Sequence, residues 1–308
     1  MKIFVLSPNV DSLLSPPQIE SLNNLGELFV VKDIQPLMEV SQLFEGDEPR
    51  ILAIDPDFCD WQVDNTFIDK IPNLKAICLQ TTSFSWIDVD HAKSLGIPVV
   101  NLRGFSTVAV AEWATMMVLA LARRLPMLIS DGWKMDYFKH RGVELRGMTA
   151  GVIGLGKIGV AIAENMAGLG MKVQYFSNSS RDERFELVSL DELMKTSDVI
   201  LPAVAKNLDT IGMISQELAY SMKPSAIFVS IVHEVYDHPQ LVKMVGDGKL
   251  FGYGFEEDKL AYGKYEGNIW DGPALGWCTS ESMSKNSELW VQSIAQAVNG
   301  ELPYIVNG

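Results

Sequence analysis

Residues 149–159 read TAGVIGLGKIG, and this stretch decides the fold. A short apolar run, typical of a buried strand, leads into the spacing G-x-G-x-x-G, and a helix is expected to follow. The first glycine permits a tight turn, the second lets the backbone approach a pyrophosphate, and the third lets helix and strand pack closely. The free N–H groups of the helix N-terminus favour phosphate at the same place. The stretch therefore predicts a dinucleotide site formed by Gly154, Leu155, Gly156, Lys157, Ile158 and Gly159.

The next expected strand, residues 172–176, should end at the adenosine ribose of the dinucleotide. An NAD site usually places Asp or Glu there, but here the position falls on Ser177, followed by Asn178. A carboxylate would repel a 2′-phosphate, whereas small polar groups with Arg181 and Arg184 nearby suit one. The sequence thus favours NADP(H) over NAD(H). The alternative is an ordinary solvated loop with scattered charges.

The chain on both sides of this motif alternates short apolar runs with helical stretches. Runs of this length suit strands that are buried on both faces, as in parallel sheets. The expected strands are residues 3–6, 28–31, 51–54, 76–79, 98–102, 149–153, 172–176, 198–204, 226–232 and 250–255. Two long helices are expected, one over about residues 107–125 with its end near Arg123–Pro126, and one over residues 280–298. The alternation predicts the α/β class, with doubly wound parallel sheets.

Composition excludes several classes of function. The 308 residues carry 25 Lys+Arg against 39 Asp+Glu, a net charge of −14, so nucleic-acid binding is not expected. The longest apolar run, residues 108–122, is interrupted by Glu112 and is shorter than the ~20 residues of a membrane span. We therefore expect no membrane association.

The cysteines carry little information about function. Cys59, Cys78 and Cys278 are odd in number and far apart, so neither a disulfide framework nor a metal-ligand spacing follows. No metal site is predicted. A reducing cytoplasm is the expected compartment.

Several motifs in order along the chain resemble one family. The stretches RGFSTVAVAE at residues 103–112, LRGMT at 145–149, MKPSAIFV at 222–229 and GELPYIVN at 300–307 are similar to motifs of the D-isomer-specific 2-hydroxyacid dehydrogenases. The likeness covers nearly the whole length. The resemblance implies a nicotinamide-dependent oxidoreductase of two lobes.

The family architecture implies where these lobes divide. A flavodoxin-like substrate domain would take residues 1–98 plus 284–308, and a Rossmann dinucleotide-binding domain would take 99–283. The resemblance also places Thr107 and Val204 among the cofactor contacts. It further implies a homodimer that associates through the nucleotide domain. The helix expected at residues 107–125 agrees with this, because it is apolar almost all round and must be buried on more than one face.

A second motif of the family concerns the small-molecule substrate. The stretch TTSFSWID at residues 81–88 resembles the family's substrate loop and implies substrate contacts from Thr82, Ser83 and Phe84. Ser83 stands where a glycine is usual. Its Cβ would crowd a backbone approach to the substrate carboxylate.

The family's chemistry depends on an Arg that holds the substrate, a His that moves the proton and a Glu beside that His. The Arg motif here reads VSIVHE at residues 229–234, which puts His233 at the Arg position. The His motif reads GPALG at residues 272–276, which puts Ala274 at the His position. A methyl group carries no proton, so the family's proton donor is missing.

The position of the family's Glu stays open. An ungapped count from Gly252 places Glu256 at the family's nicotinamide-side Asp and leaves Ala261 at the Glu position. Sliding FEED at residues 255–258 onto the family motif instead makes Asp258 the candidate. One sequence does not decide between them.

Two functional hypotheses follow. The first is an NAD(P)-dependent oxidoreductase with a non-standard substrate, in which His233 replaces the missing groups, with Asp258, Tyr253 and Tyr262 as weaker candidates. The second is a pseudoenzyme that binds the dinucleotide for a structural or sensing role. The remaining histidines show no partner pattern and are expected at the surface; they are His91, His140 and His238.

Overall fold

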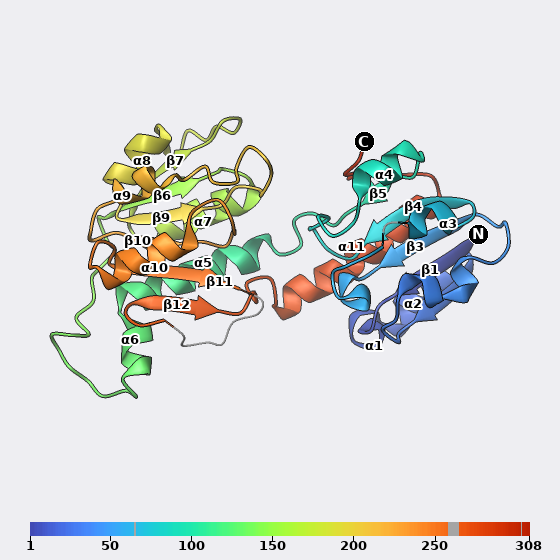
Figure 1. Cartoon of the computed structure of the whole chain (residues 1–308), viewed down its shortest axis with the longest axis horizontal. Helices are drawn as coiled ribbons and strands as arrows, with labels where there is room; N and C mark the ends of the chain where they lie inside the picture. The colour runs from blue at the N-terminus through green and yellow to red at the C-terminus, as the bar shows by residue number, and fades with distance from the viewer. Residues whose placement is uncertain (65, 258–264, 303) are drawn as a thin grey trace. The chain divides into compact units, whose positions relative to one another are not determined.

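The computed structural model describes residues 1–64, 66–257, 265–302 and 304–308. The chain divides into two compact units, Met1–Phe105 with Ser280–Gly308 and Ser106–Thr279. Each unit is built on a parallel sheet with helices packed against it (Figure 1). The predicted α/β class with two doubly wound lobes is confirmed. Which unit binds which ligand stays a prediction.

The sheet of the first unit has the strand order β2-β1-β3-β4-β5, the flavodoxin-like order, and all its paired strands are parallel. Its strands are β1 (Lys2–Leu6), β2 (Glu27–Val31), β3 (Arg50–Ile54), β4 (Leu74–Leu79) and β5 (Val99–Val100). Alternate residues of these strands point to opposite faces, so each face has its own apolar core.

The helices of the first unit cover both faces of this sheet. They are α1 (Val10–Leu13), α2 (Pro16–Asn23), α3 (Phe67–Lys70), α4 (Val89–Ser94), α11 (Ser280–Val298) and the 3-10 turns η1 (Leu37–Glu39), η2 (Ser41–Leu43) and η3 (Pro56–Cys59). Helix α11 has the bounds expected from the sequence and packs against β3 and β4. Its Trp290 is fully buried and donates its indole N–H to the carbonyl oxygen of Cys78 at 3.2 Å.

The sheet of the second unit has the order β12-β11-β10-β9-β6-β7-β8. Its strands are β6 (Thr149–Ile153), β7 (Lys172–Phe176), β8 (Glu186–Leu187), β9 (Val199–Pro202), β10 (Ile227–Val229), β11 (Gly252–Glu256) and β12 (Ile269–Gly272). The sequence did not predict β8 and β12. The first is a two-residue exposed strand, and the second contains Asp and Gly, so neither has a clear apolar run.

Helices cover both faces of the second sheet as well. They are α5 (Thr107–Ala122), α6 (Leu125–Ser130), α7 (Lys157–Gly168), α8 (Leu190–Thr196), α9 (Gln216–Tyr220) and α10 (His238–Gly246). The helix predicted to end near Arg123–Pro126 ends at Ala122, with Arg123 as its C-cap. Arg124 has a left-handed backbone with φ 51°, which stops α5, and α6 then begins with Pro126 in its first turn.

The strand order creates a switch point in the second unit. From β6 the chain first adds β7 and β8 on one side, then crosses over to add β9, β10, β11 and β12 on the other (Figure 1). Open α/β sheets bind ligands beyond the carboxyl ends of the strands at such a point. The glycine-rich loop follows β6 and therefore lies at this place.

Candidate functional site

The three glycines of the loop have different surroundings, and each explains differently why glycine stands there. Gly154 has φ +95°, and a Cβ there would lie 2.7 Å from the side chain of Val204. A Cβ on Gly159 would lie 2.0 Å from the carbonyl oxygen of Gly154, so only glycine lets α7 pack this close to the loop. By contrast, a Cβ on Gly156 would meet no atom within 4 Å. The space beside Gly156 is therefore open for a ligand.

Helix α7 begins directly at this open space. Gly156 precedes its first residue, Lys157, and accepts the N–H of Val160 at 2.9 Å. The first N–H groups of a helix have no partner within the helix and carry partial positive charge. Together with the open space, they form a cradle that fits the pyrophosphate of a dinucleotide. The structure thus brings the predicted loop residues and Val204 together.

The loop after β7 contains the predicted ribose contacts. Ser177 directly follows the strand, and its hydroxyl accepts the N–H of Ser180 at 3.0 Å. The guanidinium of Arg181 donates to the carbonyl oxygens of Ser177 and Ser180 at 3.0 and 2.8 Å, which holds it beside the strand end. Arg184 lies differently, because it forms ion pairs with Asp182 and Glu164. Of the two arginines, Arg181 is the better placed for a phosphate.

His233 lies in a turn beyond the end of β10. Ser230 builds this turn, since its hydroxyl donates to the carbonyl oxygen of Val232 and accepts the N–H of the same residue. His233 is exposed and makes no hydrogen bond or ion pair with the described residues. The adjacent carboxylate of Glu234 does not orient the imidazole, because it pairs with Lys206 at 2.7 Å.

Ala274 lies in the loop that follows β12 and is half-buried. The loop is tight: the N–H of Leu275 donates to the carbonyl oxygen of Pro273, and that of Cys278 donates to the carbonyl oxygen of Leu275. The N–H of Gly276 donates to the Oε1 atom of Glu256 at 2.8 Å. Glu256 ends β11 and is only 8% exposed.

These residues lie at the carboxyl ends of neighbouring strands. His233, Glu256 and Ala274 follow or end β10, β11 and β12, which are adjacent and parallel. The carboxyl ends of parallel strands lie on the same side, which is also the side of the glycine loop. The sequence did not identify the contact between Glu256 and Gly276.

The other residues predicted for catalysis or cofactor binding lie as follows. Asp258 and Tyr262 lie outside the described residues. Tyr253 is fully buried, burial raises its pKa well above the usual value, and its hydroxyl donates to that of Tyr236. It is therefore a poor candidate for proton transfer to a substrate. Thr107 is the first residue of α5 and is half-buried.

The remaining three histidines were expected at the surface without partners, and the structure differs from this in part. His238 is partly buried in an aromatic cage, with its ring nitrogens 2.9 and 3.1 Å from the hydroxyls of Tyr253 and Tyr265. His140 is 7% exposed and lies 2.8 Å from Asp131. His91 lies at the surface but pairs with Asp69. The expected surface position is wrong for His238 and His140 and holds for His91. All three have partners that the sequence did not indicate, because each partner is distant in sequence or on another element.

The predicted substrate loop belongs to the first unit. Thr82, Ser83 and Phe84 are exposed. The carbonyl oxygens of Thr82 and Ser83 accept hydrogen bonds from the side chains of Asn101 and Trp86 at 2.7 and 3.1 Å. Ser83 has no left-handed φ, so its side chain causes no backbone strain. Its effect on a substrate stays a prediction.

Among the residues described by the structure, no three His, Cys, Asp or Glu side chains come together as a metal site requires. Within the same part of the chain, no helix is long and apolar enough to cross a membrane.

Comparison with known proteins agrees with this geometry. Residues 115–261 match the family model described as D-isomer specific 2-hydroxyacid dehydrogenase, NAD binding domain. A glyoxylate reductase of Thermococcus onnurineus is 31% identical over 262 residues, which cover 79% of this chain and 78% of that protein.

Solved structures are similar over the whole chain. An acyclic imino acid reductase, Bsp5, in complex with NADPH and D-Arg has a TM-score of 0.84 and 26% identity, over 99% of this chain and 100% of that one. A D-lactate dehydrogenase of Aquifex aeolicus complexed with NAD and lactic acid has a TM-score of 0.81 and 25% identity, over 100% and 99%.

The fold, the glycine loop and these likenesses define an oxidoreductase that binds a nicotinamide dinucleotide. The chain belongs to the family of D-isomer specific 2-hydroxyacid dehydrogenases. The resemblance stated from the sequence is thereby confirmed. The choice between NADP and NAD, and the roles of the individual site residues, stay predictions.

Proposed function

We propose that this protein uses NADPH to reduce the carbon–nitrogen double bond of an imino acid. The observation that carries the proposal is Ala274, a methyl group in the loop where the family's proton-transfer His is expected. Bound NADPH would supply a hydride. The chain's own residues must then provide everything else that the reduction needs.

The two possible substrate classes differ in their need for a proton. Hydride addition to the carbon of a ketone leaves an oxyanion, which must take a proton from an acid on the protein. An imine is a stronger base than a ketone and reacts as the protonated iminium. Hydride addition to the iminium carbon gives a neutral amine, and no proton has to be delivered. A site with alanine at position 274 is therefore suited to an iminium.

The comparisons support this choice of substrate class. The similar structure of Bsp5 is named an acyclic imino acid reductase and holds NADPH. The curated relatives named glyoxylate reductase support the rival substrate class, a 2-oxo acid. The missing His argues against that rival, because the ketone oxygen would lose its acid. The missing Arg does not distinguish the two classes, because an imino acid carries the same carboxylate.

Oxidation of NADPH tests the proposal directly. Pyruvate and glyoxylate are offered alone, and each is then offered with methylamine, which forms the N-methyl imine in solution. We expect turnover only in the presence of the amine. Turnover near an ordinary ~10 s⁻¹ with the 2-oxo acids alone would contradict the proposal. Tight NADPH binding without turnover of either class would favour the pseudoenzyme.

The preference for NADP(H) is part of the same proposal. It is supported by Ser177, which leaves no carboxylate at the end of β7, and by Arg181, which is held beside it. We also propose a reducing cytoplasm as the compartment, since Cys59, Cys78 and Cys278 are free thiols.

We further propose a homodimer formed by the second unit. A groove of about 700 Å³ lies along α5 and α7, and its apolar lining includes Met116, Leu119, Leu125 and Leu169. Leu119 is 42% exposed in the single chain. Large exposed apolar patches mark interaction sites.

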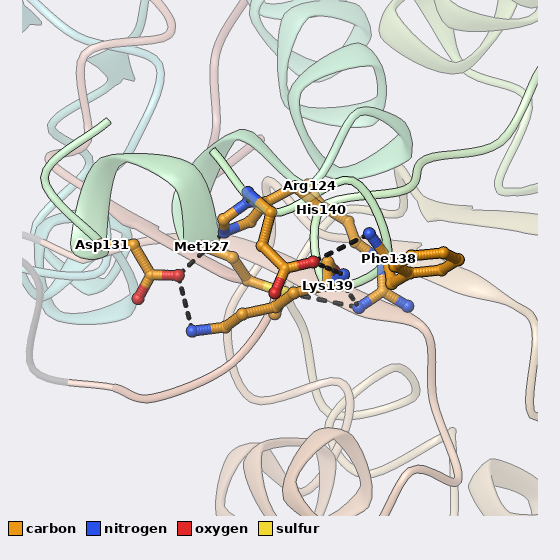
Figure 2. A network of polar contacts seen from close by, with 7 residues as sticks. Arg124, Met127, Asp131, Phe138, Lys139 and His140 are labelled. Atoms are coloured by element: carbon orange, nitrogen blue, oxygen red, sulfur yellow. Dashed lines mark hydrogen bonds and ion pairs between the residues drawn. The ribbon is translucent and has the colours of Figure 1, made fainter. Parts of the chain in front are cut away.

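A neighbouring segment exposes further apolar side chains. Between residues 131 and 140 these are Trp133, Met135, Tyr137 and Phe138, which are 65, 68, 76 and 87% exposed. Figure 2 shows how the segment is held: Asp131 meets His140 and Lys139, and Arg124 lies close by. Hydrogen bonds from Lys139 and His140 lower the pKa of Asp131. A fixed apolar segment beside an apolar groove suits a second copy of the chain.

A further inference from the structure

A small cavity in the first unit is lined by none of the residues predicted to bind substrate or cofactor. Its volume is about 150 Å³, and it is formed by residues that follow β5, by helix α11 and by the segment after α11. The polar side chains of the lining are those of Asn101, Arg103, Gln292, Ser293, Gln296 and Tyr304. Arg103 is the one charged side chain in this lining, and it forms no ion pair with any residue that the structure describes. The cavity therefore contains a positive charge that the described part of the chain does not neutralise.

The guanidinium of Arg103 is oriented by a buried amide. Its Nε atom donates to Oδ1 of Asn101 at 3.3 Å, and Asn101 is only 2% exposed. The Nδ2 atom of Asn101 donates to the carbonyl oxygen of Thr82 at 2.7 Å, so its Oδ1 has to face Arg103. The outer nitrogens of Arg103, Nη1 and Nη2, make no hydrogen bond with the described residues. Arg103 thus presents a fixed pair of donors.

Tyr304 restricts the same guanidinium from one face. The Cζ atom of Arg103 lies 5.7 Å from the centroid of the Tyr304 ring, within the range of a cation–π contact. The segment that follows Tyr304 is fixed along β5, because the N–H of Val306 donates to the carbonyl oxygen of Val99 and the side chain of Asn307 accepts the N–H of Val99, both at 2.9 Å. The ring that lies against the cation is therefore attached to a fixed part of the chain.

Helix α11 supplies neutral donors and an apolar surface to the cavity. Gln292 and Gln296 lie one helical turn apart, and their side-chain amides make no hydrogen bond with the described residues. Each amide can donate two hydrogen bonds to an acceptor in the cavity. Leu102 and Leu289 belong to the apolar core of this face of the sheet and also line the cavity. The cavity thus combines donors with a hydrocarbon wall.

The chemistry of this lining fits a small carboxylate. A planar carboxylate matches the two outer nitrogens of an arginine in a bidentate arrangement. Two leucines beside the cation fit a short hydrocarbon chain, which a carboxylate can carry and inorganic phosphate cannot. The chain as a whole has a net charge of −14, so an arginine without an ion pair in a cavity without a lining carboxylate is a local exception.

We propose that this cavity is a second anion site, which binds a short-chain carboxylate. The carboxylate oxygens would accept from Nη1 and Nη2 of Arg103, and the hydrocarbon part would pack against Leu102 and Leu289. The inference is independent of the proposed reductase function, because it uses residues of the first unit that have no role in that proposal.

Calorimetric titration of the whole chain tests the site with three probes. Isobutyrate has the charge and the short chain, isobutyramide has nearly the same shape without the charge, and inorganic phosphate has charge without a hydrocarbon part. We expect isobutyrate to bind at least tenfold more tightly than isobutyramide, and more tightly than phosphate. Phosphate binding tighter than isobutyrate would overturn the assignment to a carboxylate.

The substitution Arg103→Gln should weaken isobutyrate binding about tenfold or more, because it removes the charged donors. Lys75→Gln is the matched control, since Lys75 is an exposed cation of β4 in the same unit and does not line the cavity. It should leave the affinity unchanged. Equal loss in both variants would indicate a general effect of net charge and overturn the inference. Isobutyrate binding that survives Arg103→Gln but is lost in His233→Ala would assign the carboxylate to the predicted substrate site and overturn it as well.

A measurement without any variant keeps the inference testable if Arg103→Gln does not fold. In the unaltered protein, the side-chain amide signals of Gln292 and Gln296 in the nuclear magnetic resonance spectrum should shift as isobutyrate is added. The shifts should follow the affinity found by calorimetry. Binding of isobutyrate without these shifts would show that the carboxylate lies elsewhere.

Discussion

At the scale of residues, His233 is the side chain predicted to stand at the family's Arg position. It is exposed at a turn held by Ser230, and its side chain has no partner among the described residues. An imidazole offers one or two single N–H donors, whereas an Arg offers a planar fork that matches a carboxylate. If His233 stands at the family's Arg position, as the sequence predicts, we expect weaker carboxylate binding but not its loss. The proposed role of His233 is to hold the substrate carboxylate.

The first prediction concerns this role. We expect His233→Ala to raise KM for the imino acid about tenfold, the loss of one charge-assisted hydrogen bond of ~1.5 kcal/mol, and to leave NADPH affinity unchanged. Initial rates with the pyruvate–methylamine imine and a fluorescence titration with NADPH measure both quantities. His233→Arg, which restores the family's cation, should lower KM. An unaltered KM in His233→Ala would show that the histidine does not touch the substrate.

The second prediction concerns the choice of cofactor. Arg181→Ala should weaken NADPH binding about tenfold or more and leave NADH binding nearly unchanged, because only NADPH has the 2′-phosphate. Arg184→Ala is the matched control, since Arg184 is already engaged by Asp182 and Glu164. It should change neither affinity. Equal affinity of the unaltered protein for NADPH and NADH, or tighter NADH, would contradict the preference.

At the scale of elements, the loop between β6 and α7 contains one glycine that the fold requires and another that only a ligand would require. Two glycines of one motif have opposite surroundings: a Cβ on Gly159 would lie 2.0 Å from the carbonyl oxygen of Gly154, while a Cβ on Gly156 would meet nothing within 4 Å. The first glycine is required by the packing of the protein on itself. The second is required only if a ligand approaches.

The third prediction follows from this contrast. Gly159→Ala should lower the free energy of unfolding by about 1–3 kcal/mol, as overpacking does, and lower the melting temperature by several degrees. Gly156→Ala should melt as the unaltered protein does but lose most of its NADPH affinity. Gly168→Ala is the control, because Gly168 lies in α7 and the new Cβ would have no atom within 4 Å. It should lower neither the melting temperature nor the NADPH affinity. Normal NADPH binding by Gly156→Ala would place the pyrophosphate elsewhere.

At the scale of the whole molecule, the sequence predicted what depends on local patterns. The order of strands and helices, the glycine loop and the bounds of α11 could be read because hydrophobic period and glycine spacing are local signals. The end of α5 could also be predicted to within a few residues, since Arg123, Arg124 and Pro126 interrupt the apolar run. The left-handed φ of Arg124, which separates α5 from α6, could not.

The contacts that distinguish this site were not predictable in the same way. Glu256 meets Gly276, and His238 meets Tyr253 and Tyr265, across separate elements of the folded unit. Such pairs follow from strand order and register, which a single sequence does not state. Replacement of the catalytic groups is predicted by a count along the motif and stays a prediction. The contact between Glu256 and Gly276 could be seen only in the fold.

The last prediction concerns assembly of two chains. Leu119 lies on α5 within the apolar groove and is 42% exposed, so a charge there would disturb an interface more than the fold of one chain. We expect light scattering at micromolar concentration to give twice the chain mass of 34.1 kDa, and Leu119→Glu to give the single mass with a similar fold by circular dichroism. Leu208→Glu is the control, because Leu208 is 94% exposed in a loop away from the groove residues. It should leave the dimer intact. A monomer for the unaltered protein, or equal dissociation by both substitutions, would show that the groove is not the contact between copies.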